Sequence, residues 1–174
     1  MKEWIISDTH FNHKNIIDYC NRPFSSVEEM NRVLINNWNS VVSNDDIVWH
    51  LGDFAMGSKE EITNLVNQLN GRINLIMGNH DNHPVKWYYD CGFNKVYDKP
   101  IIIDDYFILS HQPRTVGANL YGYIYGHIHN DDIYKDYTSN SFCACVERIN
   151  YTPILLEQAK KKMYNYKNIT KGKG

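Results

Sequence analysis

The sequence lacks any long apolar run. No stretch of its 174 residues approaches the ~20 consecutive apolar residues that a membrane-spanning helix needs. Near the N-terminus the only apolar run is Trp4–Ile6, which is too short for the core of a secretory signal. We therefore expect a cytoplasmic protein with no membrane partner.

Cysteine is scarce as well, with four residues in the chain. Without an expected export signal, reduced thiols are the default state. Cys143 and Cys145 are separated by a single residue. Two buried thiols on one face of a strand are the favoured interpretation, and metal binding or pairing is the alternative.

The sequence also has no excess of positive charge. Its net charge of −2 argues against an extensive nucleic-acid surface, because such surfaces neutralise phosphates with Lys and Arg. Apolar residues make up 43% and charged residues 22%, which excludes disordered, collagen-like and coiled-coil chains. We expect one domain over residues 1–174, with the last ~8 residues as a loose tail.

Strand and helix patterns alternate in the first half of the chain, which predicts parallel strands joined by crossover helices. Ser-x-x-Glu capping-box patterns mark the starts of two helices, the first at Ser25 or Ser26 and the second at Ser58. The second half favours hairpins. The expected strands are Lys2–Ser7, Asp46–Leu51, Ile73–Met77, Val96–Tyr97, Ile101–Ile103, Tyr106–Ser110, Tyr121–Tyr125 and Ser141–Arg148, followed by a helix over Pro153–Tyr166. This pattern predicts a layered α/β sandwich with mixed sheets.

Polar residues of metal-binding type follow several predicted strands directly. Each such element alone is also compatible with a turn or a core histidine. In α/β sheets, however, ligands bind beyond the carboxyl ends of the strands, so the elements together predict one shared site. They are Asp8-x-His10, Gly52-Asp53, Gly78-Asn79-His80-Asp81, Ser110-His111 and Gly126-His127-x-His129.

The side-chain types narrow the chemistry of this site. His, Asp and Asn ligands without thiolates suit Mn²⁺, Fe, Zn²⁺, Ni²⁺ or Co²⁺ rather than Ca²⁺ or a structural zinc. The set is large enough for two cations, and an Asp can bridge them through its two oxygens. Two metals about 3.5–4 Å apart activate water and stabilise the charge that develops during displacement at phosphorus.

The ordered motifs SDTHF, LGDF, MGNHD, SHQP and YGHIH resemble those of the calcineurin-like metallophosphoesterase superfamily, in particular its small bacterial and phage members. The resemblance implies a four-layer α/β/β/α sandwich of two mixed sheets without a cap domain. It implies two divalent ions, with Mn²⁺ expected first. Asp8, His10 and His129 would hold one ion, Asn79, His111 and His127 the other, and Asp53 would bridge them.

The resemblance also implies roles in catalysis. A hydroxide bridging the metals would attack phosphorus, His80 would assist the leaving group, and Asp81 would orient His80. Asn79 and His80 would contact the substrate phosphate. Independently of the resemblance, Arg114 lies three residues past His111 and is a further candidate phosphate contact, with a solvated loop arginine as the alternative.

Phe54 follows Asp53 in place of the Asp-Arg-Gly pattern of protein Ser/Thr phosphatases, which disfavours a protein substrate. We expect a small phosphodiester or monoester, such as a nucleotide. The alternatives are a non-catalytic metal-binding scaffold of the same fold and a nuclease acting on short nucleic-acid ends.

Overall fold

Short apolar runs joined by crossover helices form the first sheet. The computed structural model describes residues 1–113, 121–131 and 140–171, with side chains through Met163. Four strands of this sheet are parallel, and β9 pairs antiparallel to β1 in the order β4-β3-β2-β1-β9. The strands are β1 (Glu3–Ile6), β2 (Ile47–His50), β3 (Arg72–Ile76), β4 (Lys95–Tyr97) and β9 (Ile154–Leu155).

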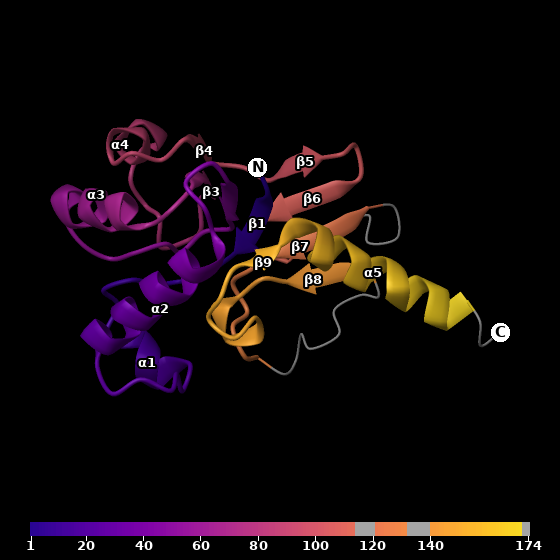
Figure 1. The fold of residues 1–174 in the computed structure, drawn as a ribbon, viewed down its shortest axis with the longest axis horizontal. Coiled ribbons are helices and arrows are strands. Elements are labelled where there is room, and N and C mark those ends of the chain that lie inside the picture. The colour runs from indigo at the N-terminus through magenta and orange to yellow at the C-terminus, as the bar shows by residue number, and fades with distance from the viewer. Residues whose placement is uncertain (114–120, 132–139, 172–174) are drawn as a thin grey trace.

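Helices cover the outer face of this sheet (Figure 1). Both predicted N-caps are present, because Ser26 Oγ accepts from Glu29 N–H and Ser58 Oγ accepts from Glu61 N–H. These hydroxyls satisfy backbone donors that lack a partner inside the helix. The helices of the first half are α1 (Ile16–Tyr19), α2 (Val27–Val41), α3 (Lys59–Gln68) and α4 (Val85–Asp90).

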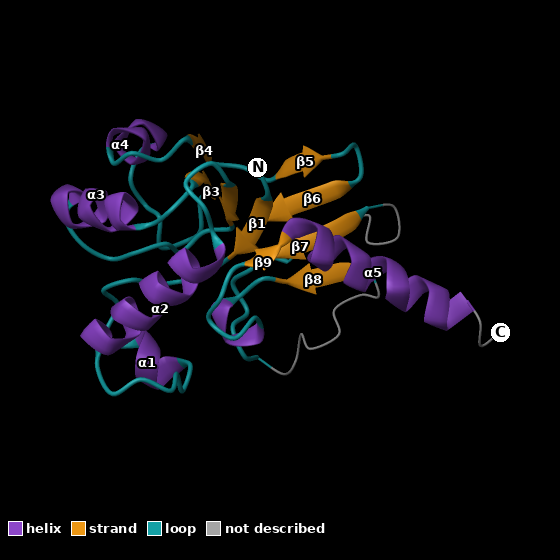
Figure 2. Cartoon of the chain, in the orientation of Figure 1, coloured by secondary structure: helices purple, strands orange, loops and turns teal. Residues whose placement is uncertain are grey.

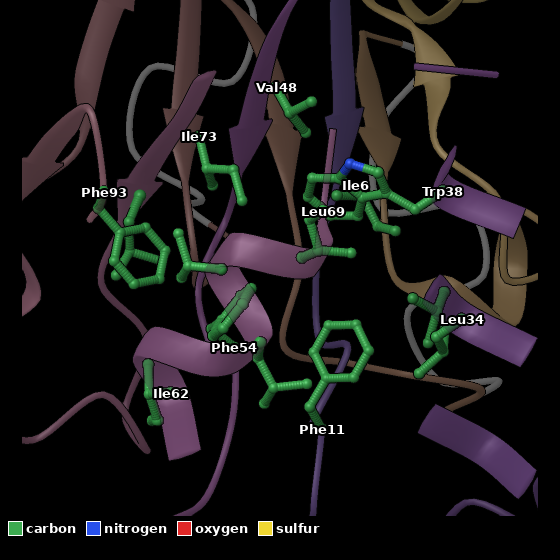
Figure 3. Close-up of a cluster of buried hydrophobic side chains, with 14 of the residues drawn as sticks. Ile6, Phe11, Leu34, Trp38, Val48, Phe54, Ile62, Leu69, Ile73 and Phe93 are labelled. Carbon is green, nitrogen blue, oxygen red and sulfur yellow. The ribbon is translucent and has the colours of Figure 1, made fainter. Parts of the chain in front are cut away.

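Side chains that alternate along the strands divide the core into separate clusters. Ile6 on β1, Val48 on β2 and Ile73 on β3 pack with Leu34 and Trp38 of α2 on the helical side (Figure 3). This alternation follows from the period of two in a strand. The first sheet is therefore buried on both faces, as sheets of parallel strands generally are.

The second sheet follows in the chain and has the order β5-β6-β7-β8 (Figure 2). Its strands are β5 (Ile101–Ile103), β6 (Phe107–Ser110), β7 (Gly122–Tyr125) and β8 (Ser141–Cys143). Only the β5–β6 pair forms the expected hairpin, since β6, β7 and β8 are parallel.

Apolar side chains from both sheets form a common cluster. Ile5 of β1 and Trp49 of β2 join Leu109 of β6 and Ile124 of β7. The C-terminal helix α5 (Leu156–Lys171) adds Leu156, Ala159 and Met163 to this cluster. The shared core fixes how the two sheets sit against each other.

The predicted strand over Ser141–Arg148 is wrong beyond Cys143. After β8 the chain crosses to the end of β1, where Ser7 N–H donates to Ala144 O at 2.8 Å and Cys145 forms a bridge with Ser7. Residues Val146–Arg148 then form a 3-10 turn. Alternating residues do not show where a strand changes its partner, so the pattern could not indicate this turn.

The predicted helix start at Pro153 is also wrong. Ile154 and Leu155 pair with Ile5 and Trp4 of β1, and the helix begins at Leu156. The fold class is confirmed: the chain is an α/β protein of two mixed sheets with flanking helices, and the described residues form no separate cap domain. Within those residues, no helix combines the length and apolar character needed to cross a membrane.

Candidate metal centre

The segments that follow β1, β2, β3, β6 and β7 converge at one place between the sheets. Asp8 N–H donates to Gly52 O, and His10 N–H donates to Asp53 O, both at 3.0 Å, so the first two segments run side by side. Gly126 N–H donates to His111 O at 2.9 Å, which joins the last two in the same way. The convergence predicted from the strand ends is therefore present.

One group of ligand atoms surrounds the Nε2 atom of His111. This atom lies 2.9 Å from Asn79 Oδ1, 3.1 Å from His127 Nδ1 and 3.5 Å from Asp53 Oδ2. His111 Nδ1 lies 2.8 Å from the carbonyl of Leu51, which can only accept, so this contact places a proton on Nδ1 and leaves Nε2 as the atom able to bind a metal. Lone pairs that face one another repel, and a cation between them would remove this repulsion.

A second group contains Asp8, His10 and His129. Asp8 Oδ1 lies 3.6 Å from His129 Nε2 and 3.9 Å from His10 Nε2. His10 Nε2 also lies 3.4 Å from Asp53 Oδ2, which places Asp53 between the groups. Atoms bound at ~2.1 Å to one ion lie roughly 3–3.5 Å apart, so these spacings approach those of a coordination sphere.

Two of these atoms have no hydrogen-bond partner among the described residues although they are buried. They are Asp8 Oδ1 and His10 Nε2. A buried polar atom without a partner costs free energy, and a cation at this position would remove that cost. The donor set therefore fits divalent metal ions.

Burial keeps His10 in the form that binds metal. Burial, followed by the charge of His129, lowers the pKa of His10 far below its usual range, so its ring is neutral. Burial also raises the pKa of the Asp53 carboxyl. In the absence of cations, burial therefore disfavours a charge on His10 and on Asp53, and a bound cation would favour the ionised form of the Asp53 carboxyl.

The backbone at the site adopts an uncommon conformation. The φ angles of Asp8, His10, Asp53, His127 and His129 are 59°, 49°, 56°, 74° and 43°. A non-glycine residue in this left-handed region costs about 1–3 kcal/mol, and residues under such strain often cluster at functional sites. These turns direct successive side chains of each motif to the same point.

The motif glycines allow the segments to approach closely. A Cβ atom at Gly126 would collide with Ser7 Oγ and Asp8 Oδ2, and one at Gly78 would collide with the Asp53 carboxylate. A side chain at either position would displace a ligand.

A comparison with known families assigns the chain. The family model described as calcineurin-like phosphoesterase matches residues 1–164. The chain belongs to the calcineurin-like phosphoesterase family. This membership agrees with the metal-ligand groups of the site and with the resemblance carried by the five motifs.

Relatives in this family include an uncharacterized protein of Methanocaldococcus jannaschii, which is 41% identical over 90% of this chain and 88% of its own length. The gene 66 protein of Mycobacterium phage L5 is 43% identical over 47% of this chain and 41% of its own length. A solved structure of a protein of unknown function from Aquifex aeolicus has a TM-score of 0.72 and 29% identity, covering 92% of this chain and 98% of that one.

In this calcineurin-like phosphoesterase, His80 is exposed beside the ligand groups. Its ring centroid lies 5.2 Å from that of His10, and its backbone N–H donates to Asp53 Oδ1 at 2.8 Å. Asp81 was expected to orient the ring of His80, but its hydrogen bonds are with backbone N–H groups. Its oxygens accept from the backbone N–H groups of Asp53, Phe54 and Gly78. Asp81 thus fixes the turn that carries the Asp53 carboxylate.

Some important residues were not found from the sequence. Arg22 and Glu147 form a buried ion pair next to His129, and Cys145 Sγ donates to Asp8 Oδ2 at 3.3 Å. Arg22 and Glu147 belong to no motif, and the incorrect strand over Ser141–Arg148 concealed the direction of Glu147. For Cys145, the close spacing to Cys143 was the sequence feature that could have indicated a role near the site.

The remaining sequence predictions have mixed outcomes. Arg114 lies outside the described residues, so its phosphate contact stays a prediction. His50 is buried in β2 and its Nε2 lies 2.9 Å from Thr9 Oγ1, so this histidine has a packing role outside the two ligand groups. The four cysteines are free, as expected for reduced thiols.

Cavities adjoin the candidate metal centre. One of about 770 Å³ is lined by His127, His129 and Tyr19. Another of about 220 Å³ is lined by Asn79 and His80. Space for substrate therefore exists next to both groups of ligand atoms.

Proposed function

We propose that this chain hydrolyses a small phosphate ester with the help of two divalent cations. The observation that carries the proposal is the pair of ligand groups that share Asp53 and direct nitrogen and oxygen atoms at common centres. In such a setting, bound divalent cations act as Lewis acids on phosphoryl oxygens and generate a nucleophile from water at neutral pH.

The proposed division of the ligands follows the family resemblance. Asp8, His10 and His129 would hold one ion, and the other would be held by Asn79, His111 and His127, with Asp53 contributing to both. This set has nitrogen and oxygen donors with no thiolate. It suits Mn²⁺, which we propose first, as well as Fe, Co²⁺, Ni²⁺ or Zn²⁺.

His80 is the proposed general acid. It is exposed at the cavity that adjoins Asn79, so an incoming ester can reach its ring. Its backbone N–H is bound to Asp53 Oδ1, which keeps the ring close to the metal ligands without making it one of them. From this position His80 donates a proton to the leaving oxygen, and Asn79 donates its amide protons to a phosphate oxygen.

The substrate we propose is a nucleotide or another small phosphate ester. The two cavities lie on different sides of the ligand groups and leave room for substituents on phosphorus. Phosphodiesters and monoesters both fit this description, so the assay includes both.

The test measures hydrolysis of bis-aryl and mono-aryl phosphates and of 2′,3′- and 3′,5′-cyclic nucleotides with added Mn²⁺. We expect turnover that disappears with a chelator. His80→Ala should lower kcat by at least ~10²-fold while the metal content stays unchanged. The control is Tyr89→Ala, because Tyr89 is an exposed aromatic residue of α4 that does not line the cavity beside Asn79 and His80.

Folded protein with full metal content and no turnover on any ester would contradict the proposal and favour the scaffold alternative. Turnover confined to short oligonucleotides would favour the nuclease alternative.

A further inference from the structure

A buried ion pair lies behind the ligand group of Asp8, His10 and His129. Arg22 Nη2 lies 2.8 Å from Glu147 Oε1, and the two side chains are 0% and 1% exposed. Arg22 Nε donates to the same oxygen at 2.9 Å. Removing two charges from water costs several kcal/mol per ion, and this cost can exceed the attraction between them. The pair therefore need not stabilise the fold, and its contacts point to another role.

Glu147 contacts the edge of the His129 ring that is turned away from the ligand group. Glu147 Oε1 lies 2.9 Å from His129 Nδ1, whereas Nε2 on the other side of the ring lies 3.6 Å from Asp8 Oδ1. A carboxylate that accepts the Nδ1 proton fixes the tautomer and turns the Nε2 lone pair toward a metal. The ring cannot rotate without breaking this contact.

Arg22 also holds the backbone of the first motif. Its Nη2 donates to Asp8 O at 2.7 Å, and its Nη1 donates to Thr9 O at 2.9 Å. These carbonyls belong to the turn in which Asp8 and His10 have positive φ angles. One guanidinium therefore connects this strained turn to the carboxylate that orients His129, using the planar fork geometry that a lysine lacks.

We do not interpret this network as a third cation site. Ligand atoms of Cys20, His129 and Glu147 do lie within 4.8 Å of one another. However, Arg22 already occupies Glu147 Oε1, and its positive charge opposes a cation there. The geometry favours a supporting role for His129.

We propose that Arg22 and Glu147 are positioning residues, which orient His129 and the Asp8–His10 turn for one of the two cations. This inference rests on the proposed function only for the presence of two metal sites. It assigns the pair to the site of Asp8, His10 and His129 alone. The site of Asn79, His111 and His127 should not depend on it.

The first experiment titrates Co²⁺ into the full chain and follows both sites by visible absorption and equilibrium dialysis. Glu147→Gln should lower the affinity for one of the two Co²⁺ ions by about 10–100-fold and leave the affinity for the other unchanged. Arg22→Lys should have the same selective effect. The matched controls are Glu60→Gln and Arg32→Lys, because both residues are exposed on helices. Wild-type affinities in both variants, or equal loss of the two ions, would overturn the inference.

A second measurement needs no variant at these positions and therefore does not depend on their folding. In the Zn²⁺-loaded wild type, nitrogen-15 NMR should show His129 bound through Nε2, with a slowly exchanging proton on Nδ1. The exposed ring of His83 provides the reference for rapid exchange. Coordination through Nδ1, or exchange at His129 as fast as at His83, would contradict the role of Glu147.

The two proposals fail in different ways. If the wild type hydrolyses no ester but Glu147→Gln selectively weakens one Co²⁺ ion, the positioning role stands and the proposed activity falls. If the wild type hydrolyses esters and both variants bind two ions normally, the activity stands and the positioning role falls.

Discussion

Asp8 shows how much of the site depends on the surroundings of a single residue. Its φ angle is 59°, and its Oδ2 accepts from His127 N–H at 2.8 Å and from Cys145 Sγ. These donors leave Oδ1 without a hydrogen-bond partner among the described residues. Contacts from several segments thus maintain an unfavourable backbone conformation and aim one oxygen at the metal position.

Asp46 offers a test at the same scale, away from the metal ligands. It accepts from Trp4 Nε1 at 3.0 Å, Lys2 N–H at 2.7 Å and Ser43 N–H at 3.1 Å. These hydrogen bonds, led by that of Trp4, lower the pKa of Asp46 from 3.8 to about 2. Because the pKa is depressed in the folded state, the stabilisation is complete above pH 3.8 and is lost as the pH falls through 2.

We therefore expect Asp46→Asn to lower Tm most above pH ~4, with a difference from wild type that shrinks as the pH falls toward 2. Thermal unfolding followed by circular dichroism between pH 6 and 2.5 measures this difference. The neighbouring exposed Asp45→Asn is the control. A difference that stays constant with pH would show that the charge of Asp46 is not responsible.

At the scale of elements, local sequence patterns predicted the helices well. The N-cap at Ser26 and the capping box at Ser58 need only residues within one helical turn, so both helix starts could be recognised directly. The end of β8 could not, because Ala144 and Cys145 change from pairing in the second sheet to contacting Ser7. When a strand changes its partner to a distant segment, the local sequence pattern does not show where the change occurs.

Ser58→Ala tests the contribution of the α3 capping box. Loss of the hydroxyl leaves Glu61 N–H without its acceptor, which should cost about 1 kcal/mol and lower Tm by roughly 2–4 °C. The control lies in the same helix: Thr63 Oγ1 donates to Lys59 O, a bond that is not part of a cap. Thr63→Ala should leave Tm unchanged or slightly raised, because alanine has the higher helix propensity. Equal losses in chemical-denaturation measurements on both variants would argue against the cap.

At the scale of the whole molecule, the ligand groups connect the two sheets. Asp8, Asp53 and Asn79 follow strands of the first sheet, whereas His111 and His127 follow strands of the second. Ions held between them bind the native arrangement and not the unfolded chain. Metal binding should therefore stabilise the entire fold and not only the loops around the site.

Addition of Mn²⁺ should raise Tm, and a chelator should reverse the increase. At 100 times the Kd, one bound ion contributes about 2.7 kcal/mol, or roughly 5–10 °C for a chain of this size. Asp53→Ala should abolish most of the increase because Asp53 lies between both groups. Asp45→Ala, before the start of β2, should retain it. A metal-induced shift that is the same in Asp53→Ala as in wild type would contradict the assigned centre.

The amino-acid sequence by itself determined the fold class, the helix starts at Ser26 and Ser58 and the motif residues that form the candidate metal centre. These depend on residue type and short spacing: capping boxes act within a turn, and His, Asp and Asn at strand ends carry their chemistry wherever the strands meet. Only the tertiary structure decided the surroundings of those ligands. Arg22 and Glu147 are 125 positions apart, yet share a buried hydrogen bond beside His129. No local spacing specifies such a contact, because it arises when separate sheets pack and bring distant side chains into the same water-free space.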